Sequence, residues 1–118
     1  MKKLIIGILI LFLIIRCNLF YTKDEAKFIV TDFSKKRIDT LMPYKGETYI
    51  GGYVTYIIRV KGYTNDSIKI EREGYYDIIL SGQIDTLMNG DYYGGEDVIY
   101  TFNPYKATKG ELEIEYDL

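Results

Sequence analysis

Apolar and polar residues alternate along most of this chain, and that two-residue period limits what the chain can fold into. The alternation is longest over residues 53–60 and equally regular over residues 111–116. The residues that would share the inward face of these two segments are Val54, Tyr56, Ile58, Val60, Leu112, Ile114 and Tyr116. Successive side chains of a strand point to opposite faces, whereas a helix repeats about every 3.6 residues. The pattern therefore predicts strands from residue 28 onward and no helix.

Turn residues divide this region into short segments, and their spacing predicts the architecture. Breaks are expected at Gly62, at Gly74, at Ser81-Gly82 and around Pro104. About seven or eight short strands with frequent turns are typical of antiparallel sandwiches. We therefore expect an all-β fold, a small antiparallel β-sandwich over residues 28–118. Its acid-rich last strand would lie at an edge protected by charge.

A five-residue motif occurs twice and suggests internal symmetry. Residues 38–42 and 84–88 both read Ile-Asp-Thr-Leu-Met, 46 positions apart. We interpret the copies as equivalent units of a sandwich with pseudo-twofold halves, because a solenoid requires three or more repeats. Asp39 and Asp85 would then be turn or bulge residues whose side chains accept backbone N–H groups. The alternative is that the two Asp-Thr pairs share a ligand.

The N-terminus has the features of an export signal. Lys2 and Lys3 precede an apolar run over residues 4–15, and the chain's only cysteine, Cys17, follows it. This run is short for a stable membrane span, since a hydrocarbon core of about 30 Å takes roughly 20 helical residues. We therefore divide the chain into a signal peptide or membrane anchor (1–17), a tether (18–27) and a β domain (28–118).

The segment Ile14-Ile15-Arg16-Cys17 resembles the lipobox of bacterial lipoproteins. The plan of a signal, a tether and one β domain is similar to that of small bacterial lipoproteins of unknown function. In that family the cysteine is acylated and becomes the first mature residue, so the resemblance implies a lipidation site at Cys17. Arg16 occupies a position that usually holds a small residue.

Two alternatives for the N-terminus stay open. One is an uncleaved anchor that extends to about Tyr21, with Arg16 reaching the lipid headgroups. The other is an ordinary cleaved signal that releases a soluble domain. Lipidation and an uncleaved anchor both predict a protein attached to a membrane of the cell envelope, periplasmic or surface-exposed and outside the cytoplasm.

The composition argues against catalysis and against nucleic acid as a partner. The chain has no histidine, the commonest general base and a member of the Ser-His-Asp and Cys-His arrangements. We therefore expect neither enzymatic activity nor a cofactor. Residues 74–118 carry nine acidic and two basic side chains, which would repel a phosphate backbone.

Tyrosines supply the first candidate binding residues. The chain has 13 tyrosines and no tryptophan, and Tyr75, Tyr76, Tyr92 and Tyr93 form two adjacent pairs beside glycines. Neighbouring residues of a strand point to opposite faces, so we expect one tyrosine of each pair to face outward. Exposed tyrosines act as anchors in protein interfaces. The alternative is that these tyrosines fill the rim of the core.

Acidic residues around a pair of glycines supply the second candidate site. Asp91, Glu96 and Asp97 flank Gly94-Gly95. Carboxylates and backbone carbonyls of a flexible loop can coordinate calcium, although the spacing does not match an EF-hand. The alternative is a solvated connection in which the glycines supply the turn and the acids face water.

Together these features favour a membrane-tethered, exported binding module that is not an enzyme. Its partner would be an unknown protein or an envelope component, contacted through tyrosine-rich loops or the acidic C-terminal face. One alternative is an envelope immunity protein, in which an acidic surface captures a basic toxin. Another is a calcium- or carbohydrate-binding module.

Lipidation of Cys17 can be tested directly by mass spectrometry of the membrane fraction. We expect a mature chain that starts at Cys17 and carries added acyl mass, because the lipobox-like segment ends at this residue. A chain that begins at Met1 or Lys2 would rule lipidation out.

Overall fold

Six strands make up the part of the protein that the computed structural model describes, residues 23–43, 55–92 and 96–118. In chain order they are β1 (Glu25–Val30), β2 (Arg37–Leu41), β3 (Thr55–Arg72), β4 (Ile78–Asp91), β5 (Val98–Asn103) and β6 (Gly110–Asp117). All paired strands are antiparallel, and these ranges contain no helix. The all-β, antiparallel prediction is therefore confirmed, with fewer and longer strands than expected.

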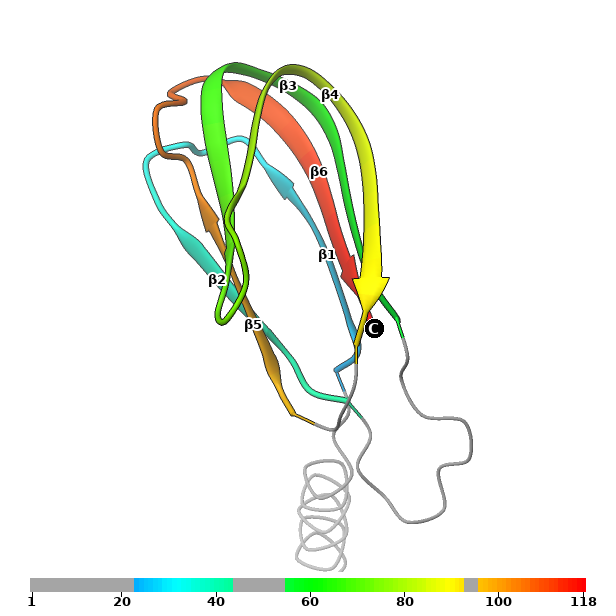
Figure 1. The fold of residues 1–118 in the computed structure, drawn as a ribbon. Helices are drawn as coiled ribbons and strands as arrows, with labels where there is room; N and C mark the ends of the chain where they lie inside the picture. The colour runs from blue at the N-terminus through cyan, green and yellow to red at the C-terminus, as the bar shows by residue number, and fades with distance from the viewer. Residues whose placement is uncertain (1–22, 44–54, 93–95) are drawn as a thin grey trace, which may run out of the picture.

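The sheet is built on β3. Its strand order is β1-β6-β3-β5-β2, and β4 lies off this path, paired with β3. One edge of β3 carries β4 from Thr55 to Ile70. The other edge carries β6 from Ile57 to Thr64 and then β5 from Lys69 to Arg72. β3 thereby joins the part of the sheet that contains β1 and β6 to the part that contains β5 and β2 (Figure 1).

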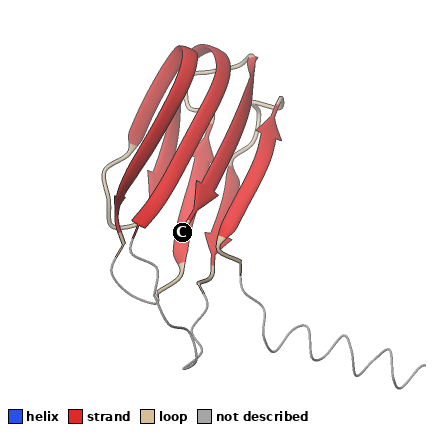
Figure 2. Ribbon diagram, turned by 90° about the vertical axis from the view of Figure 1, so that its right-hand side faces the viewer, coloured by secondary structure: helices blue, strands red, loops and turns tan. Residues whose placement is uncertain are grey.

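A bend in the β3–β4 hairpin folds the sheet over its own core. The 18 residues of β3 would span roughly 60 Å if the strand were straight, at about 3.3 Å per residue. Instead both strands arch over the top of the molecule, and β1 and β6 face β2 and β5 across the interior (Figures 1 and 2). The register shifts between Thr64 and Ile68, and such a bulge bends the strand that carries it.

Glycines mark this bend. Gly62 and Gly82 have φ angles of 141° and 75°, which residues with a Cβ rarely adopt. They lie close together along the hairpin, because Gly62 pairs with Ile84 and Gly82 pairs with Thr64. The predicted chain breaks at Gly62 and at Ser81-Gly82 are therefore wrong. Both strands continue through these residues and bend there.

Polar contacts fasten the bulge of β3 to the loop between β5 and β6. The side-chain oxygen of Asn65 accepts the backbone N–H groups of Thr108 and Lys109 at 2.9 and 3.0 Å. The backbone oxygen of Ser67 accepts the N–H of Ala107 at 3.1 Å. The bend and the last connection of the fold are thus fixed to each other.

The core lies between the facing parts of the sheet and takes side chains from every strand. Its buried members are Ala26, Phe28, Val30, Phe33, Leu41, Ile58, Val60, Ile68, Ile70, Ile84, Tyr100, Phe102, Ala107, Leu112, Ile114 and Tyr116. Among them, Tyr100 and Tyr116 stack with their ring centroids 4.3 Å apart and their planes 11° apart. The predicted inward faces of the regular alternating segments are confirmed: Ile58, Val60, Leu112, Ile114 and Tyr116 are buried, and Tyr56 is partly buried against this core. Val54 lies outside the described residues.

A backbone bridge joins Lys23, which precedes β1, to Met42, which follows β2, and so brings the two ends of the sheet together. Lys23 and Met42 exchange backbone hydrogen bonds of 2.9 and 2.6 Å. Beside the bridge, the buried carboxylate of Asp39 pairs with Arg37 at 2.9 Å and with Lys23 at 3.9 Å. Buried carboxylates in proteins are usually paired with such partners. β1 itself begins at Glu25, inside the segment predicted to be a tether.

The repeated motif does not mark equivalent positions. Asp39 and Leu41 on β2 face the core, whereas Asp85 and Leu87 on β4 face solvent. Because a shift of one residue moves every side chain to the other face of a strand, the two copies are out of phase. The predicted pseudo-twofold halves and the turn roles of the two aspartates are therefore wrong.

Gly62→Ala is expected to destabilise the protein by about 3 kcal/mol, because a Cβ would add overpacking to backbone strain. A Cβ at this position would collide with the backbone oxygen of Glu111 on β6. Gly82→Ala is the matched control, because its φ is also positive but nothing lies within 4 Å of the added Cβ. The control should lose only about 1 kcal/mol. Urea unfolding measures both losses, and equal values would contradict the close β3–β6 contact.

Candidate functional site

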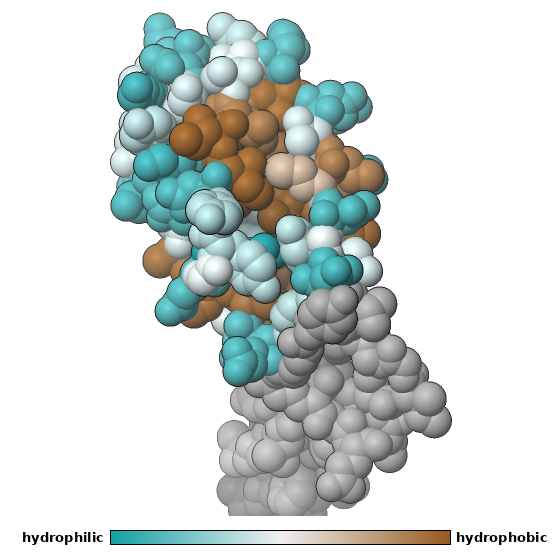
Figure 3. Space-filling view, in the orientation of Figure 1, coloured by the Kyte–Doolittle hydropathy of each residue, from teal (hydrophilic) through white to brown (hydrophobic). Residues whose placement is uncertain are grey.

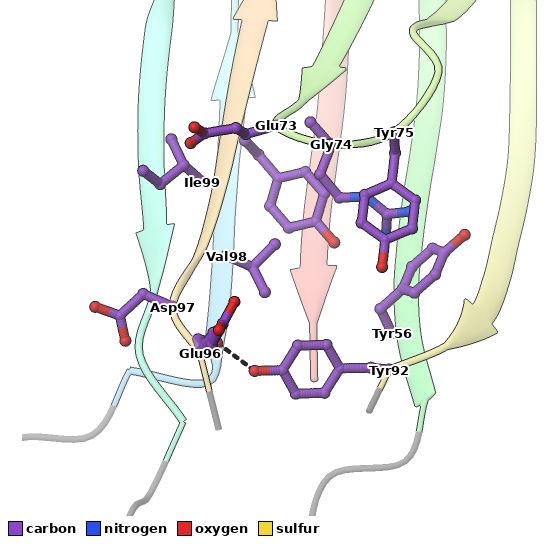
Figure 4. A pocket seen from close by; sticks show the side chains of 11 residues that line it. Tyr56, Glu73, Gly74, Tyr75, Tyr92, Glu96, Asp97, Val98 and Ile99 are labelled. Atoms are coloured by element: carbon purple, nitrogen blue, oxygen red, sulfur yellow. Dashed lines mark hydrogen bonds between the residues drawn. The ribbon is translucent and has the colours of Figure 1, made fainter. Parts of the chain in front are cut away.

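The arch divides the β3–β4 hairpin into two arms, one that ends at Thr55 and Asp91 and one that ends at the hairpin turn, residues 73–77. A cavity of about 390 Å³ lies between the ends of these two arms, with Tyr56 on one and Arg72 on the other. Its lining comes from β3, β5, the hairpin turn and the segment between β4 and β5. The lining residues are Tyr56, Arg72, Glu73, Gly74, Tyr75, Tyr92, Glu96, Asp97, Val98, Ile99 and Tyr100. Figure 4 shows Tyr56 and Tyr75 close together on the right, Glu96 and Val98 on the left, and Tyr92 below.

Arg72 is the cation of this cavity. It continues the inward phase of Ile70 and lies opposite the buried Tyr100 of β5. Its guanidinium carbon is 3.9 Å from the ring centroid of Tyr56 and 3.3 Å from that of Tyr75. Among the described residues, no carboxylate lies within ion-pair distance of it. Arg72 is therefore a half-buried cation held by aromatic faces, each contact contributing about 0.5–2 kcal/mol.

Behind Arg72, the stacked Tyr100 and Tyr116 have fully buried hydroxyls that make no hydrogen bond with the described residues. Burial raises the pKa of both phenols, and the nearby guanidinium of Arg72 partly offsets this rise at Tyr100. Both hydroxyls therefore stay protonated at neutral pH. Buried polar groups without a partner are uncommon in folded proteins. Tyr100 also lines the cavity, in register with Arg72.

The predicted tyrosine pairs divide between the cavity and the solvent. Tyr75 contacts Arg72 but is still 57% exposed, and Tyr76 is 97% exposed, so both rings of this pair reach solvent. Both lie in the hairpin turn, not in a strand as predicted. Tyr92 is buried, and its hydroxyl donates to the backbone oxygen of Glu96 (Figure 4). Tyr93 lies outside the described residues.

The acids predicted to bind calcium are exposed. Asp91 ends β4, and Glu96 and Asp97 precede β5. Within residues 23–43, 55–92 and 96–118, no group of three or more acidic, histidine or cysteine side chains is arranged to hold a metal ion. Residues 93–95, the centre of the predicted loop, lie outside the described residues. The calcium site stays a prediction.

Sequence reasoning missed Tyr56, Arg72 and Tyr100 as site residues. Arg72 offered a usable signal, because it falls on the apolar phase of its strand two residues after Ile70. A charge on an inward phase needs either a partner or a function. Tyr56 and Tyr100 offered no signal, since tyrosine is common in strands.

The acidic residues of β6 lie on an interior strand, and the predicted charge-protected edge is therefore wrong. β6 runs between β1 and β3. Its Glu115 is in register with Lys27 and Arg59, and its Glu113 with Lys61. Lys27 also donates to Glu113 at 3.0 Å, which raises the pKa of the lysine. Opposite charges on neighbouring strands stabilise each other. The acidic residues of β6 are therefore flanked by basic side chains of β1 and β3.

Carboxylates gather where β1 begins and β6 ends. Asp117 lies opposite Glu25 in the register. Partial burial, followed by the carboxyl groups of Glu115, Glu25 and Asp24, raises the pKa of Asp117 to about 6. Burial and like charges both disfavour an ionised carboxylate. The folded state therefore favours the protonated form of Asp117.

Asp117→Asn is expected to stabilise the protein near pH 7.5 and to change little near pH 4. The folded-state pKa of about 6 lies above the ordinary value of 3.8. Protonation of Asp117 therefore contributes stability that is fully present below about pH 4 and lost as the pH rises through about 6. Melting midpoints at the two pH values measure the effect. Asp77→Asn, which removes an exposed acid from the hairpin turn, is the control, and an equal response of both variants would contradict the assignment.

Comparison with protein-family models, curated proteins and solved structures found no match to this chain. The described residues include no helix with the length and apolar character needed to cross a membrane. Cys17 and the apolar run at residues 4–15 lie outside these residues.

Proposed function

We propose that this protein is a membrane-tethered, exported binding module without catalytic activity, and that the cavity between the hairpin arms holds its partner. The export signal predicted at residues 1–17, with Cys17 as lipidation site, would supply the tether. The described strands would form a small β-sandwich outside the cytoplasm. The partner is a protein or another component of the cell envelope.

The composition of the cavity is the observation that carries this proposal. Ligand sites are concave and mostly apolar, with a few polar groups that fix the orientation of the ligand. The lining of this cavity exposes more polar than apolar surface: tyrosine rings, Val98 and Ile99 supply the apolar part, and Arg72 supplies a charge that can orient a ligand. Tyrosine and arginine are also enriched among the residues that dominate binding energies.

The surface near the cavity supports the same role. The inward-facing Ile78, Leu80 and Met88 of β4 are only partly buried. Figure 3 shows hydrophobic side chains gathered between the arms of the hairpin, with hydrophilic residues around them. Apolar patches rimmed by polar residues mark interaction sites. Tyr76 adds an exposed aromatic ring in the hairpin turn.

The outer face of β6 favours the cavity over the acidic C-terminal face as the contact surface. Lys27, Arg59 and Lys61 alternate there with the acids of β6. Capture of a basic toxin relies on a surface of one sign. The cavity is therefore the better-supported site.

Site-specific crosslinking in living cells tests this proposal. A photoreactive amino acid replaces Tyr76 in the full-length chain, and a matched protein carries it at Lys35, an exposed position in the β1–β2 loop. We expect a discrete crosslinked product in the membrane fraction from position 76 and none from position 35. Tyr75→Ala should lower the yield at position 76 about fivefold, because it removes one aromatic wall.

Two results would contradict the proposal. One is an equal set of products from positions 76 and 35, which would show random contacts. The other is recovery of the full-length protein from the cytosol alone, which would remove the envelope as its place of action.

A further inference from the structure

We infer that the cavity binds a small zwitterion, an amino-acid-sized molecule whose carboxylate contacts Arg72 and Tyr100 and whose ammonium group contacts Glu96. This inference rests on the proposed function, because the zwitterion would be the envelope component that the same cavity holds. It is carried by donors at one wall, a carboxylate at the opposite wall and tyrosine rings and Val98 between them.

The wall beside Tyr56 and Tyr75 offers donors to a carboxylate. The two rings cover the guanidinium of Arg72 at 3.9 and 3.3 Å from its carbon. A guanidinium has five N–H donors, and among the described residues no carboxylate lies within ion-pair distance of Arg72. Arginine is suited to this role, because its planar fork matches the two oxygens of a carboxylate.

Tyr100 supplies a second donor at the same wall. It lies directly opposite Arg72 in the register of β3 and β5, and its buried hydroxyl has no hydrogen-bond partner among the described residues. A buried polar group without a partner destabilises the folded state. A ligand oxygen that accepts from Tyr100 and Arg72 together would satisfy the hydroxyl and neutralise the cation.

Glu96 supplies the opposite charge. Figure 4 shows it beside Val98 and Tyr92, whereas Glu73 and Asp97 point away from the cavity. The hydroxyl of Tyr92 donates to the backbone oxygen of Glu96 and so holds this segment in place. Glu96 would repel a ligand that carried only a negative charge, and Arg72 would repel one that carried only a positive charge. A molecule with both charges matches the two walls.

The size and lining of the cavity set the scale of the ligand. A volume of about 390 Å³ is at the small end of the range for ligand pockets. The rings of Tyr56, Tyr75 and Tyr92 and the side chain of Val98 offer apolar contact between the charged walls. L-leucine has both charges and an apolar side chain, so it is a suitable probe.

Equilibrium dialysis and melting curves of the full-length chain in detergent micelles test the inference with three compounds. L-leucine carries both charges, L-leucinamide lacks the carboxylate, and N-acetyl-L-leucine lacks the ammonium group. We expect L-leucine to bind and to raise the melting midpoint. Each analogue should bind about tenfold more weakly, as the loss of one charge-assisted contact implies.

Tyr100→Phe isolates the donor at the carboxylate wall. It should weaken L-leucine binding about fivefold without lowering the melting midpoint of the ligand-free protein, because the deleted hydroxyl has no partner. Tyr116→Phe is the matched control. Tyr116 is equally buried, also lacks a partner and stacks on Tyr100, but it does not line the cavity. Its substitution should leave L-leucine binding unchanged.

Glu96→Gln isolates the ammonium wall. It should weaken the binding of L-leucine and strengthen that of N-acetyl-L-leucine, because it removes the attraction for one and the repulsion of the other. Three results would each overturn the inference: no binding of L-leucine at millimolar concentration, equal binding of L-leucine and N-acetyl-L-leucine, or equal effects of Tyr100→Phe and Tyr116→Phe.

The crosslinking result separates failure of this inference from failure of the proposed function. A product from position 76 without L-leucine binding overturns the ligand class and leaves the binding module standing. The absence of both overturns both.

Discussion

The pairing of β3 on both of its edges is the constraint on which the rest of the structure depends. β4 follows one edge, while β6 and β5 share the other end to end. Backbone groups from both parts of the sheet are therefore satisfied through one strand. If β3 were straight, β5 and β6 would extend along one line. The bend is what allows Tyr100 of β5 to stack on Tyr116 of β6 and lets the sheet enclose a core.

Local alternation predicted which side chains face the core, because the face of a strand residue is set by its neighbours two positions away. The glycines were misinterpreted because their role depends on a strand that is distant in the sequence. Backbone freedom at Gly62 suits either a turn or a bend within a paired strand, and the strand that lies opposite decides between them. The repeated motif at residues 38–42 and 84–88 has the same explanation, since identical residues took opposite phases on different strands.

The cavity combines residues that the sequence could and could not identify. Tyr75 and Tyr92 stood out because they adjoin glycine-rich turns, and both line the cavity. Arg72 meets Tyr100 only through the register of β3 with β5. Tyr56 contacts Arg72 because the bend in β3 brings the first and last residues of this strand toward each other. Contacts that depend on a bend in one strand cannot be inferred from the period of that strand.

β1 begins and β6 ends at the same end of the sheet, with Glu25 opposite Asp117. A mechanical force applied between these two ends would break the β1–β6 hydrogen bonds one after another, as in opening a zipper, and would not shear them together. The bridge between Lys23 and Met42 lies ahead of the first of these bonds and would rupture early. Under load the protein would thus release β1 at low force, while the arch of β3 and β4 stayed intact.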